Sequence, residues 1–424
     1  MIAHSLLTFC NLPTVKTLTL FLAALAFAST ANADWLQFRG PQGNGYIDGN
    51  QNLPIELSEN TIAWKVALPG RGIGSPLIVG DRVYLTAASG PEQKQLHVLC
   101  FSAVDGKPLW QRNFWATGRT MCHNKTCVAA PTPASDGERI YALWSSNDLI
   151  CLDLDGNLIW TRGLTLDYPN ASNSLGMASS PIVADGTLVA QIENDSESFA
   201  AGFDLLTGAN RWKIDRPKAA NWTSPVPMKS GEQVVVALQS SKGILGVLPA
   251  TGSEIFNYAK GASTIPSSAA DGDTLFVPSN GLTAINPGES GGDPTELWNE
   301  SAQRPGTASP LIIGDTVYII NGAGVLSATS RKTGELAWKD EKGDPLKGVR
   351  LKGPFSGSPV ASGNGHLYIF NEQGVGQCVN LSGDQGKIVS EIDLEETILG
   401  TPSISDDALY IRSDGHLWKF ATKP

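Results

Sequence analysis

The sequence predicts an all-β fold, an eight-bladed β-propeller of four-stranded antiparallel blades whose ring is closed by an N-terminal strand. Three observations predict it. A strand-rich repeat recurs along almost the whole chain. The 424 residues include 45 Gly and 26 Pro but only 17% charged residues, which is typical of a turn-rich β protein. The last repeat lacks one strand, and the N-terminal region has a strand to spare.

Each repeat follows one pattern: a small residue and Pro, an apolar strand, a Gly/Asp turn, two further strands, a Thr/Asp-Gly turn, and a strand that ends in Trp. The clearest copy runs from Gly74 to Trp110. Copies of about 40–55 residues with four strands each are typical of propeller blades. The copies begin near Ser75, Pro131, Ser180, Ser224, Pro266, Ser309, Ser358 and Thr401. The closing aromatic positions are Trp110, Trp160, Trp212, Phe256, Trp298 and Trp338, and the seventh copy ends weakly near Val389.

The eighth copy stops at Trp418 and Phe420 and lacks its last strand, whereas Ile62–Val66 is an unassigned strand with the sequence of that missing element. A strand donated from the start of the chain would complete the blade and remove the open sheet edges of a linear array. We therefore expect the ring to close through residues 62–66. The alternative is an open β-solenoid with an unpaired N-terminal strand.

The closing Trp is expected to be structural: its ring would wedge against the next blade while the indole N–H donates to a carbonyl. Cys100, Cys151 and Cys378 occupy equivalent positions in the third strands of their blades. Buried Cys behaves as a small apolar residue, so we expect all three to be packing residues.

The first 33 residues are expected to be a signal peptide. Lys16 precedes the apolar stretch 18–28, and small residues lead to a cleavage site after Ala33. A membrane anchor or a buried helix is the alternative, although the stretch is short for a membrane span. The expected domains are the signal peptide (1–33), an N-terminal extension (34–60) and the propeller (61–424), in a periplasmic or secreted protein.

Charge and motifs limit the function. The net charge of −10 argues against nucleic-acid binding. The loops that lead from each Trp strand to the next blade carry 15 Lys/Arg and 10 Asp/Glu, which indicates a comparatively positive face. No catalytic or metal-binding motif is found, and the acidic stretch Glu193–Glu197 is expected to be a solvated turn rather than a Ca²⁺ site. The candidate ligand or partner residues on this face are Arg71, Arg119, His123, Lys125, Asn173, Asn221, Trp222, Arg304 and Arg350.

The longest of these loops contains Cys122 and Cys127, which are separated by four residues, His123 among them. In an exported protein this spacing favours a local disulfide that stiffens the loop. The alternatives are two free thiols, a metal site that uses Cys122, His123 and Cys127, and a redox pair.

The Ser-Pro strand, Gly-Asp turn and Thr-Gly-x-x-x-Trp closure resemble the repeats of pyrroloquinoline quinone (PQQ)-type propellers. The opening Asp34–Pro41 resembles that of secreted PQQ-like propellers of planctomycete-type bacteria, and the blade number resembles the outer-membrane assembly scaffold BamB. The quinoprotein dehydrogenases in this group carry PQQ, Ca²⁺, a vicinal Cys-Cys disulfide and a catalytic Asp, and this chain has no Cys-Cys pair.

The resemblance therefore implies a non-catalytic, cofactor-free scaffold, monomeric and without a membrane span, that binds a protein or envelope polymer. The alternative is a PQQ- or metal-dependent oxidoreductase that uses the same face.

Overall fold

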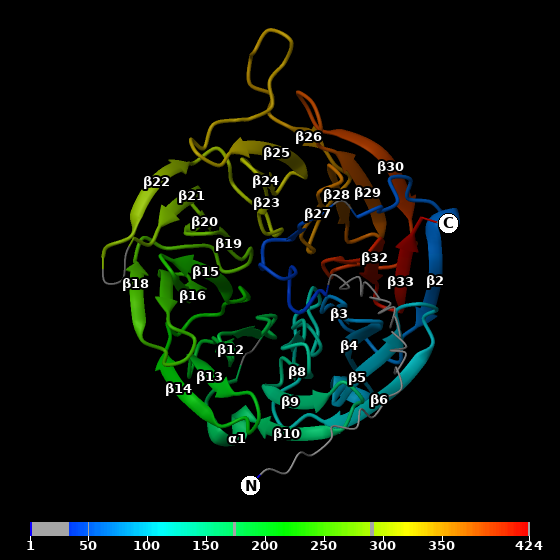
Figure 1. The fold of residues 1–424 in the computed structure, drawn as a ribbon, viewed down its shortest axis with the longest axis vertical. Coiled ribbons are helices and arrows are strands. Elements are labelled where there is room, and N and C mark those ends of the chain that lie inside the picture. The colour runs from blue at the N-terminus through cyan, green and yellow to red at the C-terminus, as the bar shows by residue number, and fades with distance from the viewer. Residues whose placement is uncertain (2–33, 50, 173–174, 289–291, 423–424) are drawn as a thin grey trace. The chain divides into compact units, whose positions relative to one another are not determined.

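The computed structural model describes residues 1, 34–49, 51–172, 175–288 and 292–422, and within them the strands form eight sheets that follow one another around a central axis (Figure 1). Seven sheets have four strands, and one has a fifth, β1, at its inner edge. The predicted all-β, eight-bladed architecture is therefore confirmed. The proposed signal peptide lies outside the described residues, apart from Met1.

The first four blades follow the chain order from inner to outer strand. Blade 1 comprises β3 (Leu77–Val79), β4 (Arg82–Ser89), β5 (Gln95–Ser102) and β6 (Pro108–Trp115). Blade 2 comprises β7 (Ala134–Ser135), β8 (Arg139–Leu143), β9 (Asp148–Asp153) and β10 (Leu158–Gly163). Blade 3 comprises β11 (Ile182–Ala184), β12 (Thr187–Ile192), β13 (Phe199–Asp204) and β14 (Asn210–Asp215). Blade 4 comprises β15 (Val226–Ser230), β16 (Gln233–Ser240), β17 (Gly243–Val247) and β18 (Glu254–Tyr258).

The remaining blades repeat this order, with two N-terminal strands added. Blade 5 comprises β19 (Ala269–Asp271), β20 (Thr274–Ser279), β21 (Gly281–Asn286) and β22 (Thr295–Glu300). Blade 6 comprises β23 (Leu311–Ile313), β24 (Thr316–Ile320), β25 (Val325–Ser330) and β26 (Val349–Arg350). Blade 7 comprises β1 (Tyr46–Ile47), β27 (Val360–Ser362), β28 (His366–Phe370), β29 (Val375–Asn380) and β30 (Lys387–Asp393). Blade 8 comprises β31 (Ser403–Ser405), β32 (Ala408–Arg412), β33 (His416–Ala421) and β2 (Ile62–Ala67). The short helix α1 (Leu164–Asp167) and 3₁₀ turns at Glu59–Thr61 and Pro91–Gln93 lie in the connections.

The ring closes through the strand that the sequence predicts. β2 pairs antiparallel with β33, with Trp64 opposite Lys419 and Val66 opposite Leu417, so the two ends of the chain share blade 8 (Figure 1). β2, which contains Trp64, thereby occupies the outer position that the Trp strands β6, β10, β14 and β22 occupy in blades 1, 2, 3 and 5. The predicted closure is confirmed, and an open solenoid is not formed.

The closing tryptophans join neighbouring blades. The indole N–H of Trp160 in blade 2 donates to the Leu205 carbonyl of blade 3 at 2.9 Å, and its ring covers Gly208. Gly208 has φ +69°, and a Cβ built there would lie 2.7 Å from the ring, so the turn glycine leaves room for the indole. The same Trp–Gly contact with a carbonyl bond recurs for Trp64–Gly106, Trp110–Gly156, Trp212–Gly252 and Trp298–Gly334. The structural role predicted for these tryptophans is confirmed.

The three third-strand cysteines pack as predicted. Cys100 pairs across the sheet with Trp110, and Cys151 pairs with Trp160, so a small side chain lies beside each indole. Cys378 occupies the matching position opposite Ser390. All three are fully buried, and burial raises the pKa of each thiol to about 12. They are inert packing residues at neutral pH.

The Trp–Gly contact predicts a difference between two glycine substitutions. Gly208 and Gly186 both have a positive φ, +69° and +66°, but nothing lies within 4 Å of a Cβ built at Gly186. Gly186→Ala should therefore cost only the backbone strain, about 1–2 kcal/mol of unfolding free energy. Gly208→Ala should cost roughly a further 1–3 kcal/mol because its methyl group overlaps Trp160. Denaturant unfolding of the two variants measures the difference, and equal losses would contradict the proposed contact.

Candidate functional site: a pocket at the mouth of the central channel

The innermost contacts between blades are hydrogen bonds from a backbone amide to a hydroxyl. The residue two positions before each inner strand is Ser or Thr, and in seven of the eight blades its N–H donates to the hydroxyl of the equivalent residue in the next blade. Seven such bonds of 2.9–3.0 Å link Ser75, Thr132, Ser180, Ser224, Ser267, Ser309, Ser358 and Thr401 in that order. We call these eight residues the hydroxyl ring. Seven of the eight are followed by Pro, and the exception is Ser267 in blade 5.

The N-terminal extension fills the middle of the ring below these residues. The segment after Asp34 lies at the centre of the eight blades (Figure 1). Trp35 is fully buried and exchanges two backbone hydrogen bonds with Ile78 of β3. Further on, β1 pairs parallel with β27, with Tyr46 opposite Ala361. The extension is therefore part of the propeller core, which the sequence analysis did not predict.

Arg39 anchors this segment in the channel. Its guanidinium donates to the backbone carbonyls of Ser268, Pro310 and Asn44, two of which directly follow hydroxyl-ring residues. The side chain is 1% exposed, and no carboxylate pairs with it among the described residues. Burial lowers the pKa of Arg39 to about 9, so the group keeps its charge at neutral pH. A net positive charge therefore lies just beneath the ring.

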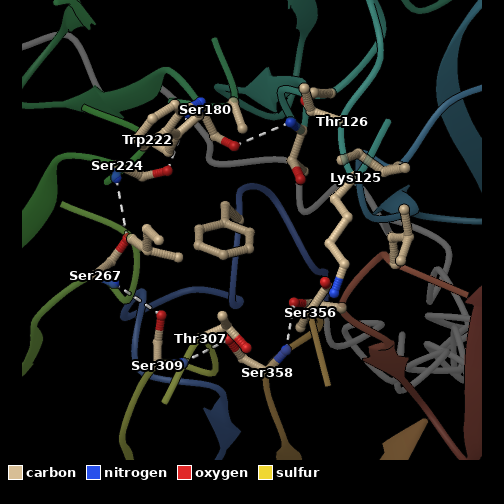
Figure 2. A pocket seen from close by; sticks show the side chains of 18 of the residues that line it. Lys125, Thr126, Ser180, Trp222, Ser224, Ser267, Thr307, Ser309, Ser356 and Ser358 are labelled. Carbon is tan, nitrogen blue, oxygen red and sulfur yellow. Dashed lines mark hydrogen bonds between the residues drawn. The ribbon is translucent and has the colours of Figure 1, made fainter. Parts of the chain in front are cut away.

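A pocket of about 410 Å³ opens above the hydroxyl ring. Figure 2 shows Ser180, Ser224, Ser267, Ser309 and Ser358 around one opening, with hydrogen bonds between neighbours. Ten lining residues carry hydroxyls: Thr126, Thr132, Ser180, Ser224, Ser267, Thr307, Ser309, Ser356, Ser358 and Thr401. Eight are apolar: Phe38, Ile73, Ala130, Leu175, Ala178, Trp222, Ile265 and Leu399. The two remaining lining residues are His123 and Lys125.

Three of the nine predicted face residues line this pocket: His123, Lys125 and Trp222. The indole N–H of Trp222 donates to the Gly176 carbonyl at 2.8 Å, which fixes the ring at the pocket wall. Lys125 Nζ forms an ion pair of 2.9 Å with Glu372, so its charge is partly compensated.

The other predicted residues lie elsewhere and have structural contacts. Arg71 pairs with Asp414 and donates to the carbonyls of Thr126 and Asn124, which fixes the cysteine loop. Asn221 is 1% exposed and donates to Glu193 and to the Gln239 carbonyl. The remaining contacts are those of Arg119 with Met121, Arg304 with Asn280, and Arg350, in β26, with the Ala323 carbonyl. Asn173 lies outside the described residues.

The predicted Cys122–Cys127 disulfide is not formed in the structure, where both are free thiols. Cys127 is fully buried in the apolar cluster around Trp144 of blade 2. Cys122 is half-buried, and its thiol contacts the Thr120 carbonyl and the Ser145 hydroxyl. The loop is instead held by Arg71, whose side chain comes from the preceding blade connection, so a local cross-link is not needed to order it.

The expectation of a solvated turn at Glu193–Glu197 is wrong for its first two residues. Glu193 and Asn194 are each 2% exposed. Glu193 forms a 2.6 Å ion pair with Arg216, which is also buried, and accepts a hydrogen bond from Asn221. Burial raises the pKa of Glu193, while Arg216 opposes that shift. This network supports the loop that carries Trp222.

Among the described residues, no group of three or more His, Cys, Asp or Glu side chains is placed to hold a metal ion. None of the helices in the described part of the chain has the length and hydrophobicity that a membrane crossing requires.

Sequence reasoning missed the hydroxyl ring and Phe38 as pocket residues. The signal was present, because Ser or Thr precedes Pro at the start of most repeats. By itself, this pattern predicts only the beginning of a strand. The position of Phe38 carried no comparable signal, because the extension has no strand periodicity.

Comparisons with known proteins agree on the architecture. The sequence profile of the family described as "Outer membrane protein assembly factor BamB" matches residues 41–172, 94–340 and 340–423. No curated protein sequence matches the chain. Among solved structures, BamB from Moraxella catarrhalis superimposes with a TM-score of 0.59 at 16% identity, over 86% of this chain and 98% of that one.

Two dehydrogenases of similarly low sequence identity have the same fold. The quinohemoprotein alcohol dehydrogenase from Comamonas testosteroni gives a TM-score of 0.65 at 13% identity, over 92% of this chain and 80% of that one. A europium-containing methanol dehydrogenase gives a TM-score of 0.66 at 13% identity, over 92% of this chain and 98% of that one. At these identities the likeness shows the fold alone.

The free thiols predict the outcome of a titration. Protein that begins at Asp34 should show five reactive thiols when denatured without a reductant, because each of the five cysteines from Cys100 onward is free. The variant Cys122→Ser should show four. A count of three for the unsubstituted protein would mean that one disulfide forms in solution and would contradict the structure.

Proposed function

Because the chain belongs to the family of outer membrane protein assembly factor BamB, we propose that it is a non-catalytic scaffold of the cell envelope that binds a protein or polymer partner at the mouth of its central channel. The observation that carries the proposal is the pocket above the hydroxyl ring, which is preformed and open to the loop face.

The rim of the pocket has the character of a binding surface. Ile265 and Leu175 line it and are 50% and 41% exposed, although both are large and apolar. Trp222 lies on the same lining, with its indole N–H already bonded inside the protein. Apolar and aromatic groups gathered around a pocket are typical of the central anchor of a protein interface.

The support for this surface is rigid, as a scaffold requires. The pocket residues are attached to inner strands that are linked around the axis by the hydroxyl ring. The channel beneath is filled by the chain's own extension, with Trp35 and Arg39 buried. A rigid surface loses little conformational entropy when a partner binds, which favours affinity.

The quinone-dependent oxidoreductase is less well supported, because the donors in the pocket do not fit its cation. Ca²⁺ takes carboxylate oxygens among its ligands. The residues that line the pocket include ten hydroxyls, one His and one Lys, with no Asp or Glu. The same lining gives no evident acid or base pair with which to activate an alcohol.

We propose a periplasmic or secreted location, with residues 1–33 acting as the signal peptide. Asp34 would then be the first residue of the mature chain. Its carboxylate accepts a hydrogen bond of 2.8 Å from the Gly80 amide, so Asp34 itself contacts the propeller. We further propose that the mature protein is a monomer.

The scaffold proposal predicts that one rim substitution removes partner binding. Ile265→Asp places a charge on the exposed rim, whereas Leu206→Asp makes the same change at a turn between β13 and β14 with similar exposure, 60%. Immobilised wild-type protein and Leu206→Asp should retain the same protein or polymer from envelope extract, and Ile265→Asp should lose it. Equal retention by all three, or turnover of an alcohol after reconstitution with PQQ and Ca²⁺, would contradict the proposal.

A further inference from the structure

The hydroxyl ring presents unused hydrogen-bond donors to the pocket. Seven of its hydroxyls accept an N–H from the neighbouring blade. Within the described residues, none of these seven donates its own proton to a protein acceptor. All seven line the pocket. A Ser or Thr hydroxyl has one donor proton in addition to its acceptor lone pairs. The pocket therefore offers a circle of O–H donors to a ligand oxygen.

The charges around the pocket favour an anion. Arg39 lies beneath the ring, bonded to Ser268 and Pro310 carbonyls and without a carboxylate partner among the described residues. Arg412 is a second buried guanidinium, 2% exposed, whose Nη1 donates to the Thr86 carbonyl, while Nε and Nη2 have no hydrogen-bond partner in the described part of the chain. Buried charges act over long distances because water does not screen them fully.

Arg412 lies behind the pocket wall rather than within it. Its guanidinium stacks on Gly72, where a Cβ would come within 2.1 Å of Nη2, and the next residue, Ile73, lines the pocket. Among the described residues, the lining has Lys125 and His123 and no acidic side chain, and Glu372, outside the lining, pairs with Lys125 and compensates part of its charge. Donors and charges therefore act in the same direction, towards a negatively charged ligand group.

The apolar walls of the pocket indicate that the negatively charged group belongs to a ligand with an apolar part. Phe38, Leu175, Trp222 and Ile265 are among the eight apolar lining residues. The volume of about 410 Å³ is within the range of about 300–1,000 Å³ that is usual for pockets holding small ligands. The pocket can therefore hold the last residue of a polypeptide. The residues before it would leave the pocket across the exposed rim at Leu175 and Ile265.

We propose that the pocket binds the carboxy terminus of a partner polypeptide: the terminal carboxylate accepts hydrogen bonds from the hydroxyl ring, and an apolar last side chain packs against the walls. This inference rests on the proposed function and specifies the chemistry of the partner. A free apolar carboxylic acid shares that chemistry, and the experiment separates the two sources.

The test uses defined peptides and the full mature chain. Isothermal titration compares acetyl-Gly-Ser-Gly-Phe with a free carboxylate, the same peptide with a C-terminal amide, and 3-phenylpropionate. The free-acid peptide should bind at least about tenfold more tightly than the amide, because charge-assisted hydrogen bonds to the ring are lost in the amide. Equal affinity of acid and amide would overturn the proposal. If 3-phenylpropionate bound as tightly as the peptide, the inference that the ligand is a polypeptide would be overturned.

Two sets of variants locate the binding. Ile265→Asp should weaken binding of the acid peptide at least about fivefold by charge repulsion, Ile265→Lys should not weaken it, and Leu206→Asp should leave it unchanged. Ser309→Ala removes one ring hydroxyl and should reduce the preference for acid over amide, whereas Ser309→Thr, which keeps the hydroxyl, should retain it. Insensitivity to all of these substitutions would place the peptide elsewhere and overturn the proposal.

Ser309→Ala also removes the acceptor of the Ser267 amide, so its folding is checked by thermal denaturation. If this variant does not fold, the comparison of Ile265→Asp with Ile265→Lys decides the test. The Ile265 side chain is half exposed, so we expect both of these variants to fold. The two proposals fail separately. Partner capture that depends on Ile265, combined with equal affinity for acid and amide, leaves the scaffold intact and removes only the carboxylate inference.

Discussion

The hydrogen bond from the amide of one blade's Ser or Thr to the hydroxyl of the next is the contact on which the rest of the structure depends. It sets the spacing of the inner strands at the axis, where the segments that lead into eight strands of the one chain must approach one another without leaving buried amides unpaired. Each such bond contributes about 1 kcal/mol. At the outer side, a Trp–Gly contact with an indole-to-carbonyl bond also joins blades 1 and 2, 2 and 3, 3 and 4, and 5 and 6, so these neighbours are held at both ends.

The same constraint creates the candidate site. A hydroxyl that accepts an amide proton keeps its own proton free, so a ring built to join blades is also a ring of donors. The extension completes this arrangement, because Arg39 fills the axis immediately below and brings a charge that no carboxylate among the described residues neutralises. In our proposal, the residues that join the blades therefore also supply the binding chemistry of the pocket.

The architecture could be predicted from the sequence because its determinants are local and repeated. Trp closures and turn glycines recur with a fixed period, and the structure confirms the Trp strands of blades 1, 2, 3 and 5 and the closure through Ile62–Val66. The closing strand predicted at Trp338 is wrong, because the outer strand of blade 6 is β26 and Trp338 precedes it. The position of the extension could not be predicted, because Arg39 is satisfied by carbonyls of Ser268 and Pro310, more than 200 residues away. The buried pairing of Glu193 with Arg216 and the free thiols of the cysteine loop likewise depend on tertiary contacts that spacing does not encode.

We propose that the mouth of the channel is a binding site for a carboxylate. A crystal structure of the protein with a Phe-terminated peptide is the most decisive test. We expect the terminal carboxylate to lie within hydrogen-bonding distance of ring hydroxyls such as Ser224 and Ser309, with the aromatic ring against Trp222 and Ile265. A peptide bound along the exposed edge of β6, or one whose carboxylate points away from the ring into solvent, would contradict it.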